Sequence, residues 1–357
     1  MSESNRVADV TIALDAMGGD DGANAVVPGA NLALKERPNV HFLLFGDEKK
    51  IAPLLDKYPS LKDKSDIYHT ESVVSSDEKP SVALRRGRNS SMRLAIDCVS
   101  KGSAHGVVSS GNTGALMAMA KMSMKSMPII HRPAIASVFP TIRGQTVVLD
   151  LGANLQADAE NLAQYAVLGC VYARLLFGIK QPSVGILNVG SEEMKGHDRV
   201  RGAAAILSNV DFPGQYHGFV EGDDIPKGTV DVVVTDGFTG NIALKMAEGV
   251  AGFIGHNMRK AFTSSWPAKI GYIFAGKAIS RMRKSLDPRY YNGGIFMGLN
   301  GICIKSPGGS DAYAFSRATI RAIDLVQNNF NDRATQEMEK LIDQESFFSV
   351  DESEKAV

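Results

Sequence analysis

Short runs of apolar, largely β-branched residues alternate with longer amphipathic stretches along most of the chain. The runs predict strands at Val10–Leu14, Val40–Phe45, Gly106–Ser109, Ala134–Phe139, Thr146–Asp150, Val184–Asn188, Tyr216–Val220 and Val230–Thr235. The stretches predict helices at Ala23–Glu36, Ser81–Ser100, Ala157–Phe177 and Thr239–Ala261. Strand–helix alternation of this kind is typical of a mainly parallel sheet with helices on both faces. Since no repeat, low-complexity tract or linker interrupts it, we expect residues 1–357 to form one α/β domain with an insertion.

The predicted strands end in loops of one style, rich in glycine and in Asp, Asn or Ser. The five loops read DAMGGDDG from Asp15, SSGNTG from Ser109, DLGAN from Asp150, NVGSEEMKG from Asn188 and TDGFTGN from Thr235. Ligands of open α/β sheets bind at the carboxyl ends of the strands. If the five loops meet at one edge of the sheet, they build a single polar pocket.

The turn from Ser109 to Gly114 contains three hydroxyls, an amide and no charge, and it has two interpretations. In the first, it is only a tight strand-to-helix turn, with Asn112 or Thr113 as the helix N-cap. In the second, the first N–H groups of the helix, which lack internal partners, bind an anion. The residues of the turn by themselves do not separate the two.

The charge balance, the cysteines and the apolar segments of the sequence limit the kinds of partner and compartment to expect. Lysines plus arginines equal aspartates plus glutamates at 39 each, so no overall field attracts nucleic acid, and we expect no nucleic-acid partner. The three cysteines are scattered among apolar residues, as free thiols are in a reducing compartment. The N-terminal stretch has no apolar leader pattern, and no segment has eighteen uninterrupted apolar residues. We expect a cytoplasmic protein.

The usual cofactor and nucleophile motifs are missing from the sequence. The dinucleotide fingerprint G-x-G-x-x-G, the Walker phosphate loop, paired metal-binding histidines and the G-x-S-x-G elbow do not occur. Asp15, Asp20 and Asp21 have the chemistry to hold a hard cation, but Asp–Gly clusters more often stabilise turns, so we expect neither metal nor cofactor. A helix N-terminus contributes only about 0.3–1 kcal/mol to an anion, so a phosphate site needs cations from elsewhere. The candidates are Lys79, Arg85, Arg86, Lys195, Lys245 and Lys305.

An ordered set of motifs strongly resembles the PlsX family of phosphate acyltransferases. The motifs are IALDAMGGDDGANAVVPGA, KPSVALRR, VVSSGNTGALMA, RPAIASVFPTIRG, LDLGAN, GSEEMKG, FVEGDDI, VDVVVTDGFTGN and SDAYAF. The resemblance implies a Rossmann-like α/β/α sandwich related to phosphate acetyltransferases and isopropylmalate dehydrogenases, usually as a homodimer. It also implies transfer of a fatty acyl group from acyl carrier protein to inorganic phosphate. The acyl phosphate would then serve phosphatidic acid synthesis by a membrane glycerol-3-phosphate acyltransferase.

The chain departs from the family pattern at two places. Where the family often has a histidine after Lys-Ala, this chain has Pro307, so a histidine general acid is excluded there. After Lys195-Gly196, it has His197 and Asp198 in place of the usual Asn–Glu pair. We assign no role to these two residues.

The implied reaction needs positioning and electrostatic stabilisation more than a strong base, because phosphate is already an anion near neutral pH. We expect the phosphate or the oxyanion to be held by the turn Ser110, Gly111, Asn112, Thr113 and Gly114. Countercharges are expected from Arg85, Arg86, Lys195 and Lys305, and second-rank contacts from Asp15, Asn154, Asp236 and Asn241. Asn112, Lys305 and Asp311 are the residues that we expect closest to catalysis, with Asp236 and Asp311 orienting cations instead of acting as bases.

A basic amphipathic segment, expected as an inserted helical element over residues 259–292, has chemistry of its own. From Arg259 to Lys284 it contains seven basic residues, no acidic one and the only tryptophan, Trp266. Such a segment can lie on an anionic membrane surface, with Ile273, Phe274 and Ile279 inserted. The alternative, which does not exclude the first, is a helical hairpin packed at a dimer interface. The acidic carrier protein is expected to dock on Arg85, Arg86, Arg88 and Arg93.

Two rival functions remain open from the sequence. One is an oxidoreductase of the isopropylmalate type, which shares the implied fold and would bind NAD. The other is a non-catalytic protein that gathers carrier protein at the membrane.

Overall fold

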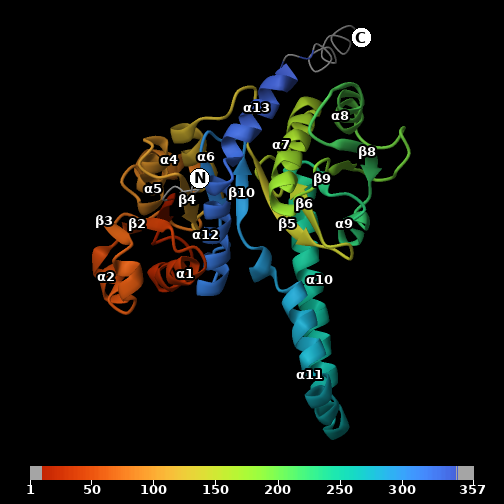
Figure 1. The fold of residues 1–357 in the computed structure, drawn as a ribbon. Coiled ribbons are helices and arrows are strands. Elements are labelled where there is room, and N and C mark those ends of the chain that lie inside the picture. Colours follow the sequence, from red (N-terminus) through yellow and green to blue (C-terminus); the bar gives the residue numbers. More distant parts are fainter. Residues whose placement is uncertain (1–9, 343, 345–357) are drawn as a thin grey trace, which may run out of the picture.

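The computed structural model describes residues 10–342 and residue 344 (Figure 1). Its centre is an eleven-stranded sheet in the order β3-β2-β1-β4-β11-β10-β5-β6-β9-β7-β8. The strands are β1 Val10–Asp15, β2 Val40–Gly46, β3 Ser65–His69, β4 Gly106–Ser109, β5 Ala134–Pro140, β6 Gln145–Leu149, β7 Ser183–Leu187, β8 Gln215–Val220, β9 Val232–Val234, β10 Gly294–Met297 and β11 Ile302–Lys305.

Helices cover both faces of this sheet, as the alternation of elements predicts. In β1, Ile12 and Leu14 face one apolar core and Ala13 faces the other, because successive side chains of a strand point to opposite faces. The helices are α1 Ala23–Glu36, α2 Glu48–Leu55, α3 Pro59–Lys62, α4 Pro80–Arg86, α5 Ser91–Ser100, α6 Thr113–Met124, α7 Ala159–Phe177, α8 Asp198–Asn209, α9 Asp224–Lys227, α10 Gly237–Thr263, α11 Trp266–Leu286, α12 Ala312–Gln327 and α13 Phe330–Ile342, with a 3₁₀ turn, η1, at Pro288–Tyr291.

The predicted elements are confirmed apart from a few particulars. All eight predicted strands exist, with ends that move by a residue or two, but β3, β10 and β11 were not predicted. The single helix predicted over Ser81–Ser100 is wrong, because α4 ends at Gly87 and Ser90 caps a new helix, its side chain accepting from the N–H of Arg93. The segment 259–292 covers the last turns of α10, all of α11 and η1.

The direction of the strands reverses in the middle of the sheet. Strands β1, β2, β3, β4 and β11 run parallel, and so do β6, β7, β8 and β9. Three successive antiparallel pairings, β11 with β10, β10 with β5 and β5 with β6, separate the two groups. The expectation that all five loops meet at one edge of the sheet is therefore wrong, since the loops after β1 and β4 leave the edge opposite to those after β6, β7 and β9.

Sheet twist compensates for this reversal. Six steps separate β1 from β9 in the sheet. At the typical twist of roughly 20–25° per step, strands six steps apart differ in direction by about 120–150°, which would turn opposed carboxyl ends toward the same side of the body. Figure 1 agrees, because the start of α10, which follows β9, and the start of β10, which pairs with the end of β11, lie at the same end of the body.

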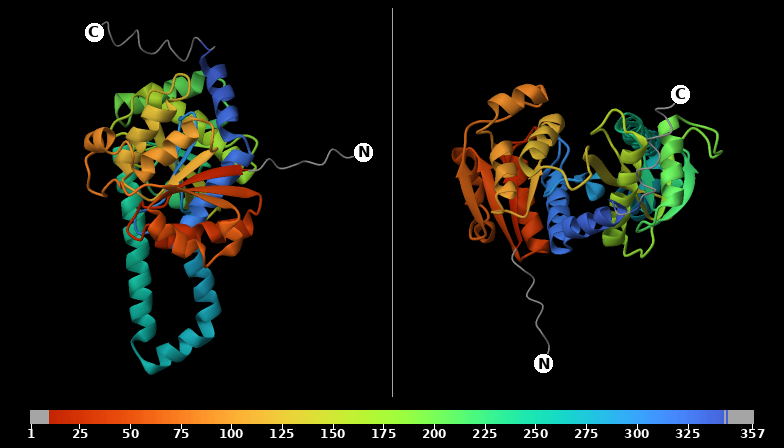
Figure 2. Two further views of the ribbon diagram at one scale, coloured as in Figure 1. Left: turned by 90° about the vertical axis from the view of Figure 1, so that its left-hand side faces the viewer. Right: turned by 90° about the horizontal axis from the view of Figure 1, so that it is seen from above.

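Helices α10 and α11 form an arm that projects from the body (Figures 1 and 2). Near the tip, the rings of Phe262 and Tyr272 meet edge to face with centroids 5.4 Å apart. Most of the arm is exposed, including the large apolar side chains Phe238, Ile242, Met246, Val250, Phe253, Ile254, Trp266, Ile270, Tyr272, Ile273, Phe274 and Met282. None of the described helices combines the length and the apolar character that crossing a membrane requires.

Candidate active site

Asp15 is the centre of a buried network at the carboxyl end of β1. The hydroxyls of Ser91 and Ser109 each donate to its carboxylate over 2.6 Å, and the side chain of Asp15 is only 1% exposed. Burial raises the pKa of Asp15, against the opposing effect of the two serine hydrogen bonds. The Ser109 hydroxyl also accepts from the N–H of Gly111 over 3.0 Å. Asp15 therefore fixes the start of the turn that leads into α6.

Asn112 caps α6, as the first interpretation of this turn predicts. Its Oδ1 accepts from the N–H of Ala115 over 2.9 Å, while its Nδ2 donates to the carbonyls of Ser75, Ser76 and Glu78 over 3.3, 3.0 and 2.8 Å. The amide thus holds the 75–78 loop against the helix. Within the described part of the chain, the N–H groups of Thr113 and Gly114 make no hydrogen bond, and both residues are exposed. The capping role leaves these two N–H groups available to an anion.

Lys305 ends β11 and turns its ammonium group into the same cluster. The Nζ donates to the carbonyl of Ser110 over 3.3 Å and to the carbonyl of Ser306. Burial lowers the pKa of Lys305 to about 8; Asp15 and Asp20 oppose this change, while Lys245 of α10 adds to it.

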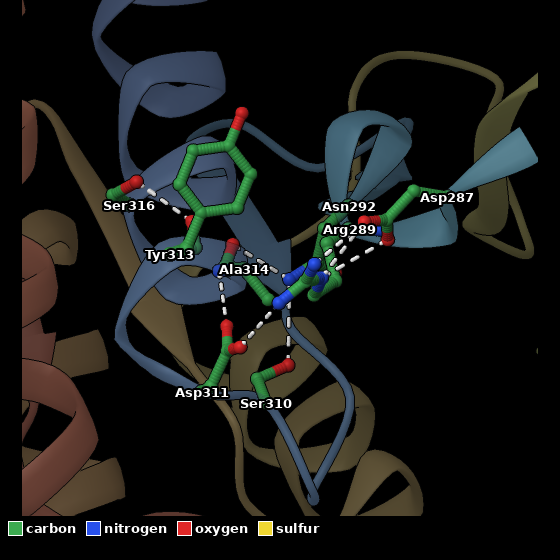
Figure 3. Close-up of polar contacts among 8 residues, drawn as sticks. All are labelled: Asp287, Arg289, Asn292, Ser310, Asp311, Tyr313, Ala314 and Ser316. Carbon is green, nitrogen blue, oxygen red and sulfur yellow. Dashed lines mark hydrogen bonds and ion pairs between the residues drawn. The ribbon is translucent and has the colours of Figure 1, made fainter. Parts of the chain in front are cut away.

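The loop after Lys305 packs against the loop after β1. The N–H of Asp20 donates to the carbonyl of Gly308 over 2.9 Å. At Gly19, whose φ is +83°, a Cβ would lie 2.7 Å from the same carbonyl, so only glycine fits. The predicted Asp311 caps α12 by accepting from the N–H of Ala314 over 2.8 Å, and it forms an ion pair of 2.8 Å with Arg289 (Figure 3). The hydrogen bond from Ala314 lowers the pKa of Asp311 most, and the contact with Arg289 lowers it further.

A second polar cluster forms at the ends of β6 and β9. Asp150, which is fully buried, accepts from the N–H groups of Ile135, Gly152, Ala153 and Asn154 over 2.8–3.1 Å, and from the side-chain amide of Asn154 over 2.9 Å. Burial is the largest influence on Asp150 and raises its pKa.

Two other predicted residues, Asp236 and Asn241, follow β9 and lie around the Asp150 cluster. Asp236 caps α10 by accepting from the N–H of Thr239 over 2.8 Å and lies 3.8 Å from Arg199. Asn241 lies against Gly152, where a Cβ would come within 3.4 Å of its side chain. Asn154 and Asn241 therefore belong to the second cluster, and no hydrogen bond within the described chain joins them to the cluster around Asp15.

Two predicted countercharges lie outside both clusters. Lys195 is exposed and pairs with Glu192 over 2.9 Å, which raises its pKa. Arg85 is exposed in the last turn of α4, and its Nε donates to the carbonyl of Ser81 over 3.3 Å. Helix α4 nevertheless begins beside the turn, since a Cβ at Gly114 would lie 2.8 Å from Pro80. The roles of both cations in phosphate binding stay predictions.

Sequence reasoning missed four side chains of the first cluster. Ser91 and Ser109 hold Asp15, and Arg289 and Asn292 hold the loop after Lys305. Only Ser109 had a signal, since it belongs to the glycine-rich turn. The other three reach the cluster from other segments, and their spacing in the sequence gives no sign of it.

A sequence model of a family described as "Fatty acid synthesis protein" matches residues 10–333. The chain is a member of this family. It is 56% identical over 330 residues to "Phosphate acyltransferase" of Rhodospirillum centenum, covering 92% of this chain and 93% of that protein. It is 52% identical to "Phosphate acyltransferase" of Paramagnetospirillum magneticum, with coverage of 94% and 95%. The resemblance drawn from the motifs is confirmed.

Solved structures of low sequence identity share the fold. "EutD phosphotransacetylase from Staphylococcus aureus" superposes with a TM-score of 0.60 at 17% identity, covering 90% of this chain and 96% of its own. A phosphotransacetylase from Streptococcus pyogenes gives a TM-score of 0.57 at 18% identity, with coverage of 93% and 94%. The predicted relation to the phosphate acetyltransferase fold is confirmed.

Proposed function

We propose that this protein transfers a fatty acyl group from acyl carrier protein to inorganic phosphate. The observation that carries the proposal is the meeting of two features in one turn. Thr113 and Gly114, at the start of α6, are exposed and their N–H groups make no hydrogen bond within the described chain, and the Lys305 ammonium group lies 3.3 Å from the Ser110 carbonyl. A helix N-terminus supplemented by a fixed cation is suited to an anion with several oxygens. Membership of the family supports phosphate as that anion.

The reaction follows from this arrangement. A phosphate oxygen attacks the thioester carbonyl carbon, the carbon–oxygen bond forms, and the tetrahedral intermediate carries its charge on the former carbonyl oxygen. The carbon–sulfur bond then breaks, and the carrier leaves as a thiolate, which needs little acid assistance. Lys305 and the N–H groups of α6 stabilise the negative charge throughout, and preorganised donors of this kind are often the largest contribution to catalysis. Asp15 supports them by holding Ser109.

The carrier protein would approach over α4. Arg85, Arg86 and Arg88 are exposed on or just after this helix. The helix begins beside the turn of residues 110–114, which we call the phosphate turn because the proposal places the phosphate there. The fourth predicted arginine, Arg93, pairs with Asp97 over 2.8 Å, so it is less available to a partner. Charge attraction to an acidic carrier should be sensitive to salt. Arg86→Ala should raise the KM for the carrier at low salt and have less effect at high salt.

The decisive test is an assay of acyl carrier protein loaded with chains of several lengths, with and without phosphate. We expect release of free carrier and formation of acyl phosphate only when phosphate is present. Release of carrier without a phosphate requirement would contradict the proposal. Thermal stabilisation by NAD, with no transfer activity, would favour the oxidoreductase, while carrier binding without turnover would favour the non-catalytic protein.

We further propose that the arm touches the cytoplasmic face of a membrane, where acyl phosphate would pass to a membrane glycerol-3-phosphate acyltransferase. On α11, Trp266, Ile273 and Phe274 are 77%, 75% and 86% exposed, with Lys269 5.9 Å from the Trp266 ring. Ile279 is only half-exposed, so it is a weaker candidate for insertion. Each basic residue near an anionic surface contributes about 1 kcal/mol, which makes binding reversible and sensitive to salt.

Phe274→Glu tests the membrane proposal. The variant should lose binding to anionic vesicles, seen as loss of the blue shift of Trp266 emission, while transfer in solution continues. Thr263→Glu, at the end of α10 in the same arm, is a charge-matched control, because it adds the same single negative charge at an exposed polar position. A Phe274→Glu protein that still binds vesicles but dissociates into inactive monomers would assign the exposed apolar side chains of α11 to a dimer interface.

The exposed face of α10 fits the predicted homodimer. Ile242, Met246, Val250, Phe253 and Ile254 recur at spacings of three or four residues, which places them on one side of the helix. An exposed apolar stripe of this length is typical of a protein interface, and we propose a second copy of the chain as its partner. Phe253→Glu should give monomers in sedimentation velocity, whereas an unchanged dimer would place the interface elsewhere.

A further inference from the structure

The arm is tied to the loop after Lys305 by two polar links through the segment that follows α11. The outer link is Arg289 of η1 (Figure 3). Its guanidinium group donates to both oxygens of Asp287 over 2.7–3.0 Å and to Asp311 over 2.8 Å, and it lies 5.8 Å from the Tyr313 ring. One side chain thus joins the base of the arm to the start of α12.

The inner link is Asn292, which is buried. Its Nδ2 lies 2.9 Å from the Ser306 hydroxyl, 3.3 Å from the Ser310 hydroxyl and 2.7 Å from the Ala314 carbonyl, and its Oδ1 accepts from the N–H of Gly293 over 2.8 Å. The two serine hydroxyls are themselves 2.9 Å apart. A buried amide with all these partners defines one position for the 306–310 loop.

This loop has a second set of anchors on its other side. The N–H of Ser306 donates to the Ser109 carbonyl over 2.9 Å, and the Gly308 carbonyl accepts from Asp20. The loop is therefore held between η1 and the phosphate turn, with Lys305 directly before it. If the contacts from Arg289 and Asn292 are lost, Lys305 remains at the end of β11, but the loop that follows it is no longer fixed. The Lys305 side chain would then move more freely and be more hydrated.

We propose that Arg289 and Asn292 are positioning residues for the transfer reaction, which set the Lys305–Asp311 loop against the phosphate turn from the base of the arm. This inference rests on the proposed function, because it assigns Lys305 to the phosphate. Neither residue contacts Lys305. Their effect passes through Asp311, Ser306 and Ser310, and a small misplacement of a charge in this site is enough to slow the reaction strongly.

The outer link can be cut without unfolding the protein. Arg289 and Asp311 are each about half exposed, at 50% and 51%, and exposed ion pairs contribute little to stability. Asp311→Asn keeps an oxygen to cap α12 but removes the charge that Arg289 binds. Arg289→Lys keeps the charge but loses the fork that spans two carboxylates.

A matched control lies at the other end of α12. Arg37 binds Asp324 with two hydrogen bonds, of 2.8 and 3.2 Å, in a pair that is about one third exposed. Arg37→Ala therefore removes an ion pair of the same kind from the same helix, far along the chain from the Lys305 loop. It should leave the kinetics of transfer unchanged.

The experiment compares steady-state transfer and hydrogen exchange of the 305–314 peptide in these variants of the full chain. We expect Arg289→Ala and Asp311→Asn to lower kcat/KM for phosphate by roughly tenfold and to speed exchange in that peptide, with partial recovery in Arg289→Lys. Asn292→Ala should act more strongly, provided that its melting curve shows a folded protein.

Wild-type kinetics and exchange in Arg289→Ala and Asp311→Asn would overturn the inference, as would equal losses in Arg37→Ala. A wild-type protein without phosphate-dependent transfer would instead refute the proposed function. In that case the exchange measurement alone would still show whether Arg289 orders the loop.

Discussion

Asp15 and Asp150 lie at corresponding places in the two halves of the sheet, yet their surroundings differ. Each follows a leucine at the end of a strand, each is buried, and burial raises the pKa of both. Asp150 accepts four backbone N–H groups and one amide, all within its own turn or the adjacent β5. Asp15 accepts mainly from two hydroxyls, which can rotate, and its charge acts on Lys305.

The difference separates a carboxylate that holds the fold from one that we propose to support the reaction. Fixed backbone donors leave Asp150 no free lone pair for a ligand or for a neighbouring cation. Rotatable donors and a nearby lysine give Asp15 an environment that can respond when charge changes in the site. Burial and a raised pKa are common to both, so neither property identifies the functional residue by itself.

The largest expected effect is on folding, from Asp150→Ala. This change removes the acceptor of four backbone N–H groups, that of Ile135 buried and those of Gly152, Ala153 and Asn154 partly buried. Each such group left unpaired costs about 1–3 kcal/mol. We expect a loss in the free energy of unfolding of more than about 4 kcal/mol, a large part of the 5–15 kcal/mol typical of a domain. Urea denaturation measures it. The comparison fails if Asp15→Ala costs as much stability as Asp150→Ala.

Lys305→Ala should leave the fold intact and lower kcat by about a hundredfold, as expected for removal of one preorganised group that stabilises negative charge. Lys305→Arg should not restore the rate, because the longer planar group cannot take the place of the ammonium beside Ser110. The phosphate-dependent transfer assay measures both, and thermal melting controls for folding. A rate near wild type in Lys305→Ala would remove the cation from the mechanism.

Asn112→Ala should lower turnover at least tenfold, about 1.4 kcal/mol of transition-state stabilisation. Asn112→Ser separates the two functions of the amide, since serine caps a helix equally well but its hydroxyl is too short to reach the 75–78 carbonyls as well. We expect the serine variant to recover stability and to keep a raised KM for phosphate. Full recovery of activity would reduce Asn112 to a helix cap.

The smallest expected effect is a shift in the pH profile. If protonated Lys305 binds the anion, as proposed, the rate should fall as pH rises through about 8, where this lysine loses its charge. Lys245→Met removes a like charge, raises the pKa of Lys305 and moves the fall to higher pH. Asp20→Asn removes an opposite charge and moves it to lower pH. Shifts of the same sign in both variants would show that Lys305 is not the titrating group.

The sequence predicts much of this fold because most strands carry a clear apolar run. Strands β10 and β11 escaped prediction, since they follow the basic helical segment and are separated only by a short, glycine-rich stretch, Gly298–Gly301. Their position could not be inferred either, because β11 pairs with β4, almost two hundred residues earlier.

The polar residues of the strand-end loops pointed to the candidate site, but they did not predict that these loops form two separate clusters, one around Asp15 and one around Asp150. The cap at Asn112 and the cluster partner Lys305 agree with the sequence motifs. The separation of Asn154 and Asn241 from Asp15 depends on the three antiparallel pairings at the centre of the sheet, which no local pattern reveals. The Arg289–Asp311 pair likewise joins residues whose types are common on any protein surface.

The late position of β11 in the chain has a consequence for synthesis on the ribosome. Until residues 302–305 have been made, β4 lacks one neighbour and exposes an edge of unpaired backbone groups. After β4 has been synthesised, more than half of the chain must still be made before β11 can pair with it. Such an intermediate is a natural client for chaperones, because exposed strand edges promote aggregation while synthesis continues. The lysine proposed to bind phosphate arrives with the same strand, so catalytic competence begins only when the sheet is complete.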